Sequence, residues 1–377
     1  MNTFFQNHET VKLALHSPLL SVIVIYGGII LLIISTAKRN NFRSAFLDRT
    51  LTDQLRGLAI LLVVTGHIGI HVLDRSSSHI FPVLGNYGVS LFFVLSGFGL
   101  TMSSQNRPFM LGDFIKRRLM KVMVPYWIIT FCILIADHFL LHQNRTPTDI
   151  LMTFLGFNTN EATRTIDYVR WYVTVLIIWY CLFAILELTV RTIKIKALLV
   201  NIFGFCLLLF SYYIVPIGYA YFSFPFGVII GLYHKQISSY IRHISSRNIL
   251  ILIAILFAST YFIKHYLFTL LLGNIPGIIL SLISELSLLI FSAASILFVG
   301  VLHRYKSDFL YLCGYLSYSI FLLHTIFMIK YDLFLFRWPL FLSFWPYLVF
   351  LLTVSWAATL FFNGLLQPAR WKALTAS

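Results

Sequence analysis

Eleven long apolar stretches run through this 377-residue chain, and they constrain its fold more than any other feature. A helix needs roughly 20 consecutive apolar residues to cross the hydrocarbon layer of a membrane. Only 11% of the residues are charged, whereas a soluble domain carries about 25%. The sequence therefore predicts an all-α polytopic membrane protein and excludes a soluble enzyme, a secreted module and a disordered chain. We predict spans at residues 18–37, 55–73, 84–103, 122–142, 170–190, 197–215, 217–233, 248–267, 279–302, 309–329 and 344–366.

The charge balance predicts how the chain is oriented. The formal net charge is +15, from 28 Lys and Arg against 13 Asp and Glu. In a soluble protein this excess indicates nucleic acid, but in a membrane protein basic residues gather in the cytoplasmic loops. If the 38–54 loop is cytoplasmic and the sides alternate, 20 of the 28 basic residues lie inside and 8 outside. We expect the amino terminus outside and the carboxyl terminus in the cytoplasm, and no nucleic-acid partner.

The second stretch holds the strongest candidate for chemistry. Arg56 and His67 are eleven residues apart, close to three helical turns, so both lie on one face, about 16 Å apart. An ionisable residue inside a span is costly and is a functional candidate by default. Burial favours the neutral imidazole, which can act as a general base. The alternative is a histidine that only packs against a neighbouring helix. His71 lies four residues further, but no nearby carboxylate completes a metal site, and we predict none.

A basic loop follows the third stretch. Residues 116–121 read Lys-Arg-Arg-Leu-Met-Lys, with four cations in six positions. Arginine side chains match phosphate oxygens through two parallel hydrogen bonds, so the loop suits a phosphate-rich cytosolic cofactor. Ordinary anchoring of a cytoplasmic loop explains the same charges equally well.

Six motifs in order resemble the acyltransferase-3 family of integral membrane acyltransferases, over about residues 48–366. They are Arg56-Gly57 with His67, the stretch 92–98, the stretch 116–126, Arg170-Trp171-Tyr172, Phe226-Gly227 with Gly231, and the stretch 314–324, which ends in His324. The resemblance implies a ten-helix acyltransferase core at 48–366. An extra helix and a basic loop would precede it within residues 1–47, and a short cytoplasmic tail would follow at 367–377.

The resemblance also implies a reaction. Members of this family are bacterial inner-membrane proteins that commonly O-acetylate cell-surface carbohydrates. Acetyl-CoA would then be the acyl donor, with its phosphates held by Arg117, Arg118 and Lys121. His67 would be the general base, with Arg56 pairing with Asp53 or contacting the donor. A glycan or lipid-linked carbohydrate would contact Trp171, Tyr172 and His324.

The chain departs from the family pattern at three positions. Lys121 replaces an arginine, Arg170 replaces a histidine, and Val173 replaces a leucine. These changes bear on donor binding and on acceptor contacts. Two further acidic residues in apolar surroundings, Asp137 and Glu285, match no motif and receive no role.

Two other functions remain open from the sequence. A multi-helix transporter would also carry a histidine inside the membrane, although transporters often show repeated halves, and none is visible here. A glycan-assembly partner that binds lipid-linked sugar without catalysis is the second alternative.

Overall fold

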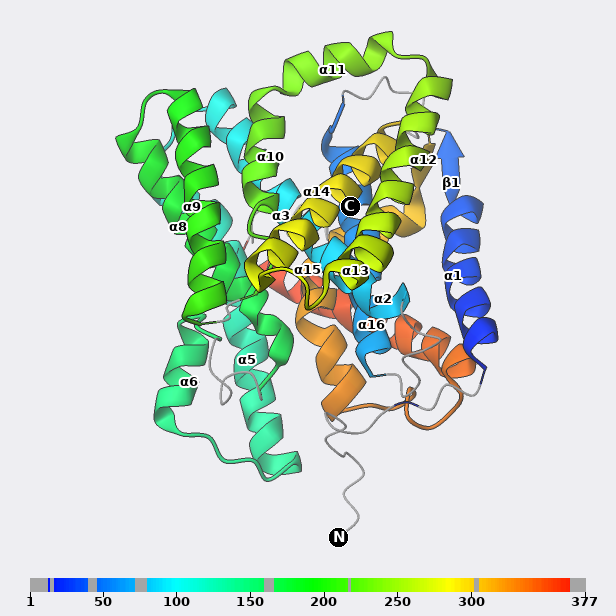
Figure 1. Cartoon of the computed structure of the whole chain (residues 1–377). Coiled ribbons are helices and arrows are strands. Elements are labelled where there is room, and N and C mark those ends of the chain that lie inside the picture. The colour runs from blue at the N-terminus through cyan, green and yellow to red at the C-terminus, as the bar shows by residue number, and fades with distance from the viewer. Residues whose placement is uncertain are drawn as a thin grey trace.

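The computed structural model describes residues 13, 17–39, 46–71, 80–158, 166–215, 218–301 and 305–366, and this part of the chain is almost entirely helical (Figure 1). The all-α prediction is confirmed. The predicted tail at 367–377 lies outside the described residues. The first elements are α1 (Pro18–Ser35), β1 (Ala37–Arg39), α2 (Arg49–Ile70), α3 (Ile80–Asn106), α4 (Leu111–Phe114), η1 (Ile115–Leu119), α5 (Met120–Leu140), α6 (Pro147–Phe154), η2 (Tyr168–Arg170), α8 (Trp171–Thr189) and α9 (Ile193–Tyr213).

The second half of the chain continues the helical pattern. Its elements are α10 (Ser223–Leu232), α11 (His234–His243), α12 (Ser246–Phe262), η3 (Ile263–Leu267), α13 (Phe268–Leu271), α14 (Gly277–Val301), β2 (Tyr305–Ser307), α15 (Asp308–Thr325), η5 (Ile326–Lys330) and α16 (Leu340–Leu366). Within the described residues, ten helical segments are long and apolar enough to cross a membrane. They correspond to ten of the eleven predicted spans.

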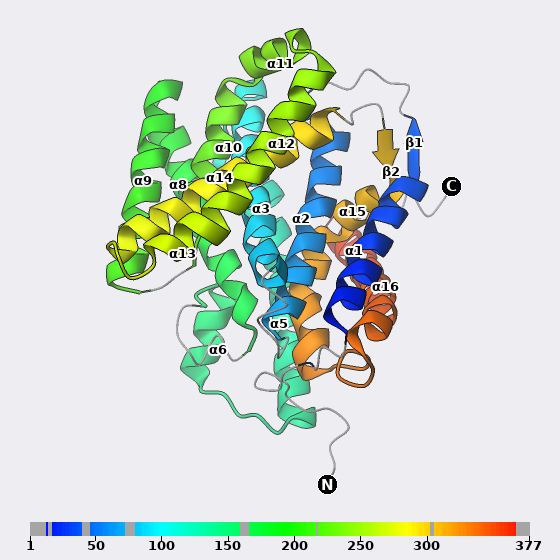
Figure 2. The same cartoon turned by 45° about the vertical axis from the view of Figure 1, so that its right-hand side comes forward.

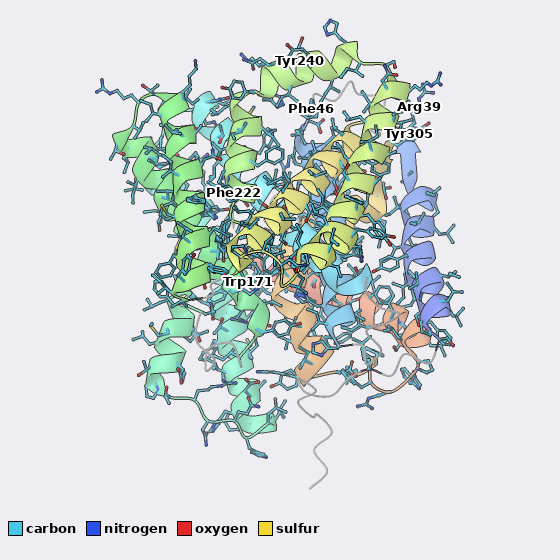
Figure 3. All side chains as sticks on the ribbon, in the orientation of Figure 1. Arg39, Phe46, Trp171, Phe222, Tyr240 and Tyr305 are labelled. Carbon is cyan, nitrogen blue, oxygen red and sulfur yellow. The ribbon has the colours of Figure 1, made fainter. Side chains whose placement is uncertain are left out.

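The segment predicted as a span at 217–233 is shorter than expected. Its helix, α10, has 10 residues and a length of about 15 Å, half of a hydrocarbon layer. Phe222, just before this helix, lies near the middle of the molecule, whereas Tyr240 on α11 lies at one end (Figure 3). The chain therefore enters along α9, turns inside the bundle and returns along α10. The start of α9 and the end of α10 therefore lie at the same end of the bundle, as they would if both helices were complete spans.

The central helices are α2, α3 and α15, which lie side by side in both views (Figures 1 and 2). Their spans are 72%, 67% and 78% buried, against 17% for the span of α1. Helices that face lipid remain apolar without being covered by protein, so burial separates the core of the bundle from its periphery. The predicted chemistry on the second stretch thus belongs to one of the most enclosed helices.

A pair of glycines brings α2 and α15 into direct backbone contact. A Cβ atom on Gly57 would lie 2.0 Å from the carbonyl oxygen of Leu310, and one on Gly314 would lie 1.9 Å from that of Asp53. Side chains larger than hydrogen cannot fit there, which is how small residues allow close packing of membrane helices. The two helices run in the same direction and touch over their first turns.

The extra amino-terminal helix is tied to this core. The strand β1 pairs antiparallel with β2, which leads directly into α15. Thr36 and Ser307 share a hydrogen bond of 2.9 Å between their hydroxyls. Lys38 pairs with Asp308 at 2.6 Å, and this hydrogen bond raises the pKa of Lys38. Helix α1 also packs on α16, where Gly28 leaves room for the ring of Trp345.

Candidate active site

Helix α2 carries both predicted catalytic residues on one continuous helix. Asp48 begins the helix as its N-cap, accepting a hydrogen bond from the backbone N–H of Leu51 at 2.8 Å. Arg56 pairs with Asp53 at 2.6 Å, one of the two partners expected for it. His67 is buried three residues before the helix ends. Arg56 and His67 therefore lie on one face of an unbroken helix, as predicted.

His67 meets a second histidine at the interface of α2 and α15. The Nδ1 atom of His67 lies 2.9 Å from the Nε2 atom of His324. The interval from Gly57 to His67 equals that from Gly314 to His324, so the close glycine contact keeps the two rings at the same level. His324 has 0% of its surface exposed and His67 has 7%, so His67 is the more accessible member of the pair.

Both ring nitrogens of His324 are occupied. Its Nδ1 lies 2.8 Å from the carbonyl oxygen of Phe321 and 3.1 Å from that of Ile320, and its Nε2 contacts His67. No ring nitrogen is left for a substrate. A substrate contact through a ring nitrogen of His324 would require one of these bonds to break, and that contact stays a prediction.

The short helix η2 lies against the histidine pair. The ring of Tyr168 meets that of His67 edge to face, with centroids 5.5 Å apart. Asp167 accepts a hydrogen bond of 2.7 Å from the hydroxyl of Thr325, the neighbour of His324. Asp167, Tyr168 and Thr325 help to line a cavity of about 10 Å³, which also borders Lys330. This volume is enough for one water.

A buried ion pair that the sequence analysis did not assign stabilises this segment. Arg170 is fully buried, with Nε 3.4 Å from the carboxylate of Asp167 and its guanidinium 4.9 Å above the ring of Tyr126. It also donates a hydrogen bond to Thr130. The available signal was the presence of two opposite charges three residues apart at the start of an apolar stretch. The arginine that replaces the family's histidine thus joins η2 to α5.

The three predicted donor-binding cations lie in different surroundings. Arg118 is half-buried and donates a hydrogen bond of 3.2 Å to the carbonyl oxygen of Gly99 near the end of α3. Arg117 is exposed and pairs with Asp113 at 3.2 Å. Lys121 is also exposed. Of the three, Arg118 is the one directed into the bundle, and donor binding by all three stays a prediction.

Tyrosines fill the interior near Arg56 and Arg118. Tyr172 and Tyr180 on α8 both lie near Ser96 of α3 and near Arg56. Tyr180 also lies near Arg118. The two cations therefore lie beside a set of buried hydroxyl groups in the core of the bundle.

The two predicted acceptor aromatics face different parts of the fold. Tyr172 is buried, with its ring 4.8 Å from that of Phe93 and 5.0 Å from that of Phe321. Trp171 packs against Tyr219 at 4.5 Å, in the loop before α10, near the middle of the molecule (Figure 3). Tyr172 is thus oriented toward the interior, and acceptor contact by either ring stays a prediction.

Glu285, which received no role from the sequence, binds the backbone just before α10. Its carboxylate accepts hydrogen bonds from the backbone N–H groups of Ala220 at 2.6 Å and of Phe222 at 3.2 Å. These groups precede α10, where the first N–H groups of a helix have no partner within it. Glu285 of α14 therefore caps a helix that begins inside the bundle.

The unassigned Asp137 joins α5 to η5. It lies 2.7 Å from Lys330 and 3.5 Å from Arg145, and it accepts a hydrogen bond of 3.0 Å from Tyr331. Both Asp137 and Lys330 are buried. The cluster therefore holds α5 against η5, the segment that follows the helix carrying His324.

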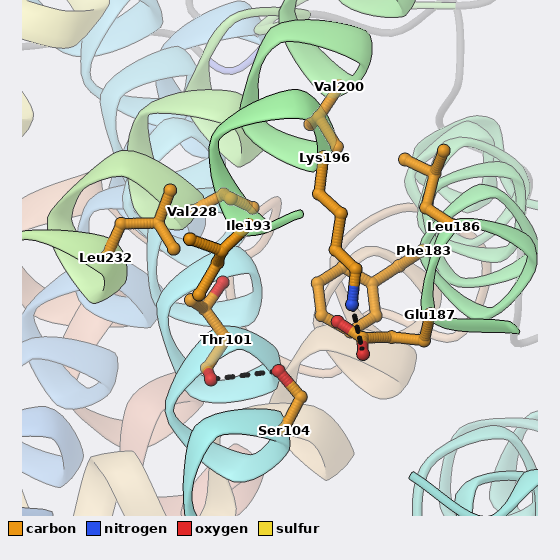
Figure 4. Close-up of a pocket in the computed structure, with 10 residues that line it drawn as sticks. All are labelled: Thr101, Ser104, Phe183, Leu186, Glu187, Ile193, Lys196, Val200, Val228 and Leu232. Atoms are coloured by element: carbon orange, nitrogen blue, oxygen red, sulfur yellow. Dashed lines mark hydrogen bonds and ion pairs between the residues drawn. The ribbon is translucent and has the colours of Figure 1, made fainter. Parts of the chain in front are cut away.

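A pocket between α3, α8, α9 and α10 is closed by an ion pair (Figure 4). Lys196 lies 2.7 Å from Glu187, beside the hydroxyls of Thr101 and Ser104. Its volume is about 10 Å³, which holds one water and no acyl donor. The pair therefore connects α8 and α9 and forms no substrate site.

Comparison with known proteins identifies the family. The chain matches the acyltransferase domain of the acyltransferase-3 family over residues 49–360. The protein belongs to the acyltransferase-3 family. It is therefore a multi-pass membrane acyltransferase. No curated protein and no solved structure matches the chain significantly. Within the described residues, no group of three or more His, Cys, Asp or Glu could hold a metal ion.

Proposed function

We propose that this acyltransferase moves an acetyl group from cytosolic acetyl-CoA to a hydroxyl of a cell-surface or lipid-linked glycan, with His67 as general base. The observation that carries the proposal is the position of His67. Its ring is buried in the core of the bundle, on the same helix as Arg56 and beside η2. A base in the core of the bundle suits transfer from a donor on one side of the membrane to an acceptor on the other.

The donor enters from the end that contains β1 and α11. This end carries Lys38, Arg39 and Lys235, as expected of a cytoplasmic surface. Arg118 contributes a bidentate cation for the donor phosphates, and Arg56 lies further inside. The rise from Arg56 to His67 is about 16 Å, a path along which the pantetheine arm extends past the tyrosine hydroxyls. The protein is then an inner-membrane enzyme with its amino terminus outside.

The acceptor enters from the opposite side, past η2. Tyr168 and Thr325 border the histidine pair there. Tyr172 supplies an aromatic face nearby. A hydroxyl that arrives from this side meets His67 before it meets the completely buried His324.

The reaction is a direct acyl transfer. As His67 takes the proton of the acceptor hydroxyl, the acceptor oxygen bonds to the acetyl carbonyl carbon. The carbon–sulfur bond of the thioester then breaks. The CoA thiolate leaves and receives the proton from His67, so the enzyme returns to its starting state. General-base catalysis of this kind contributes roughly 10²–10⁴-fold to the rate.

The family assignment favours this function over the transporter and the non-catalytic glycan-binding partner. A transporter needs no thioester and no base beside an acceptor entrance. A non-catalytic partner would tolerate the loss of His67.

The test is mass spectrometry of surface glycan from cells that express the wild type or the His67→Ala variant. We expect the acetyl mass increment to disappear in the variant while the protein inserts normally. His138→Ala is the matched control, because His138 is an exposed histidine of α5 bonded to Asn144, away from the pair. Full acetylation by His67→Ala would eliminate His67 as the base.

A further inference from the structure

The hydrogen bonds of His324 determine which of its nitrogens carries the proton. Its Nδ1 lies 2.8 Å from the carbonyl oxygen of Phe321 and 3.1 Å from that of Ile320. Carbonyl oxygens only accept hydrogen bonds, so Nδ1 must be the donor. The opposite tautomer would direct a nitrogen lone pair at two oxygen lone pairs in a buried site. In the neutral ring, Nε2 of His324 is therefore an acceptor.

The proton on His67 follows from its neighbour. Its Nδ1 is 2.9 Å from the Nε2 of His324, and two acceptors cannot bond to each other, so Nδ1 of His67 donates. A neutral histidine that donates through Nδ1 carries its lone pair on Nε2.

The segment of α15 that carries His324 is itself held in place. Tyr347 of α16 donates its hydroxyl hydrogen to the carbonyl oxygen of His324 at 2.7 Å. Asp167 holds the next residue, Thr325, through a hydrogen bond of 2.7 Å. Partners on two other segments thus fix the acceptor that His67 needs.

We propose that His324 is a positioning residue that sets the tautomer of His67 and leaves its Nε2 atom as the proton acceptor. The inference rests on the proposed function and extends it to a single atom. When Nε2 takes the acceptor proton, the His67 ring becomes a cation. The bond from its Nδ1–H to His324 then becomes charge-assisted and stronger. His324 thus stabilises the charged form without touching the substrate.

Two matched substitutions separate this role from a packing role. In His324→Gln the side-chain oxygen reaches the place of Nε2 and can still accept from His67, whereas in His324→Asn the shorter amide cannot. We expect His324→Asn to lower kcat for acetyl transfer by roughly 10²-fold or more, with the KM for acetyl-CoA unchanged within threefold. We expect His324→Gln to recover at least tenfold of that loss. Equal rates in the two variants would overturn the inference.

A spectroscopic measurement on the wild type keeps the test decisive if a variant does not fold. Nitrogen-15 spectra of the histidine-labelled protein in lipid bilayers report which nitrogen of each ring is protonated, with His67→Gln used for assignment. We expect a protonated Nδ1 and a bare Nε2 for His67, and a protonated Nε2 with a bare Nδ1 would refute the assignment. Full acetylation by His67→Ala would instead contradict the proposed function, so the two failures differ.

Discussion

Replacing Gly57 with alanine should separate the rings of His67 and His324, although Gly57 lies ten residues before His67. The added Cβ would lie 2.0 Å from the carbonyl oxygen of Leu310, whereas ordinary contacts begin at 3.4 Å. The nearest atoms that this Cβ would meet all belong to the backbone of α15, so no side chain can rotate away, and α15 must move by about 1.4 Å from α2. A rigid shift of this size stretches the 2.9 Å bond between His67 and His324 to about 4.3 Å, which is no longer a hydrogen bond.

Two measurements distinguish this local effect from general damage. Forced overpacking costs typically about 1–3 kcal/mol, so we expect a modest fall in the melting temperature of the detergent-solubilised protein. Transfer of labelled acetyl groups should fall by a much larger factor, roughly 10²-fold, because the base loses its orientation. Gly27→Ala is the control, since a Cβ there meets nothing within 4 Å.

The reasoning would be refuted by normal acetyl transfer in Gly57→Ala together with an unchanged melting temperature. That result would mean that the two helices tolerate separation and that the histidine contact is incidental. Gly314→Ala provides an independent repetition, because its Cβ would overlap the carbonyl oxygen of Asp53 from the other helix.

Three further predictions follow from contacts around the site. Glu285→Leu should lower the melting temperature by the equivalent of about 1–3 kcal/mol by leaving the N–H groups before α10 unpaired, and Glu285→Gln should cost less; equal losses would contradict the capping role. Asp137→Ala should lower the free energy of unfolding more, by about 3–5 kcal/mol, because Lys330 then becomes a buried charge without its nearest acid. Adding Lys330→Met to this variant should restore stability in thermal scans. Arg118→Ala should raise the KM for acetyl-CoA at least tenfold and Arg117→Ala less than threefold, because Arg118 is directed inward and Arg117 pairs with Asp113 at the surface; the reverse order in steady-state kinetics would refute this placement.

The placement of Arg56 and His67 on one helix could be predicted from the sequence because that part of the problem is local. Arg56 and His67 belong to one helix, and the period of 3.6 residues places them on one face without any knowledge of the other helices. The same local rule and the cost of exposing apolar side chains to water predicted the membrane spans. The family's motifs then supplied the prediction of which residues of those spans form the site.

The three-dimensional structure decided what these residues contact. His67 and His324 are 257 positions apart, and no periodicity within either helix predicts that they meet. Glu285 could not be read from the sequence either, because the helix that it caps begins inside the bundle rather than at a membrane surface. Hydrophobic patterns and helix propensities depend on near neighbours along the chain. Contacts between helices depend on their packing, which here depends on two glycines that hold α2 and α15 in register.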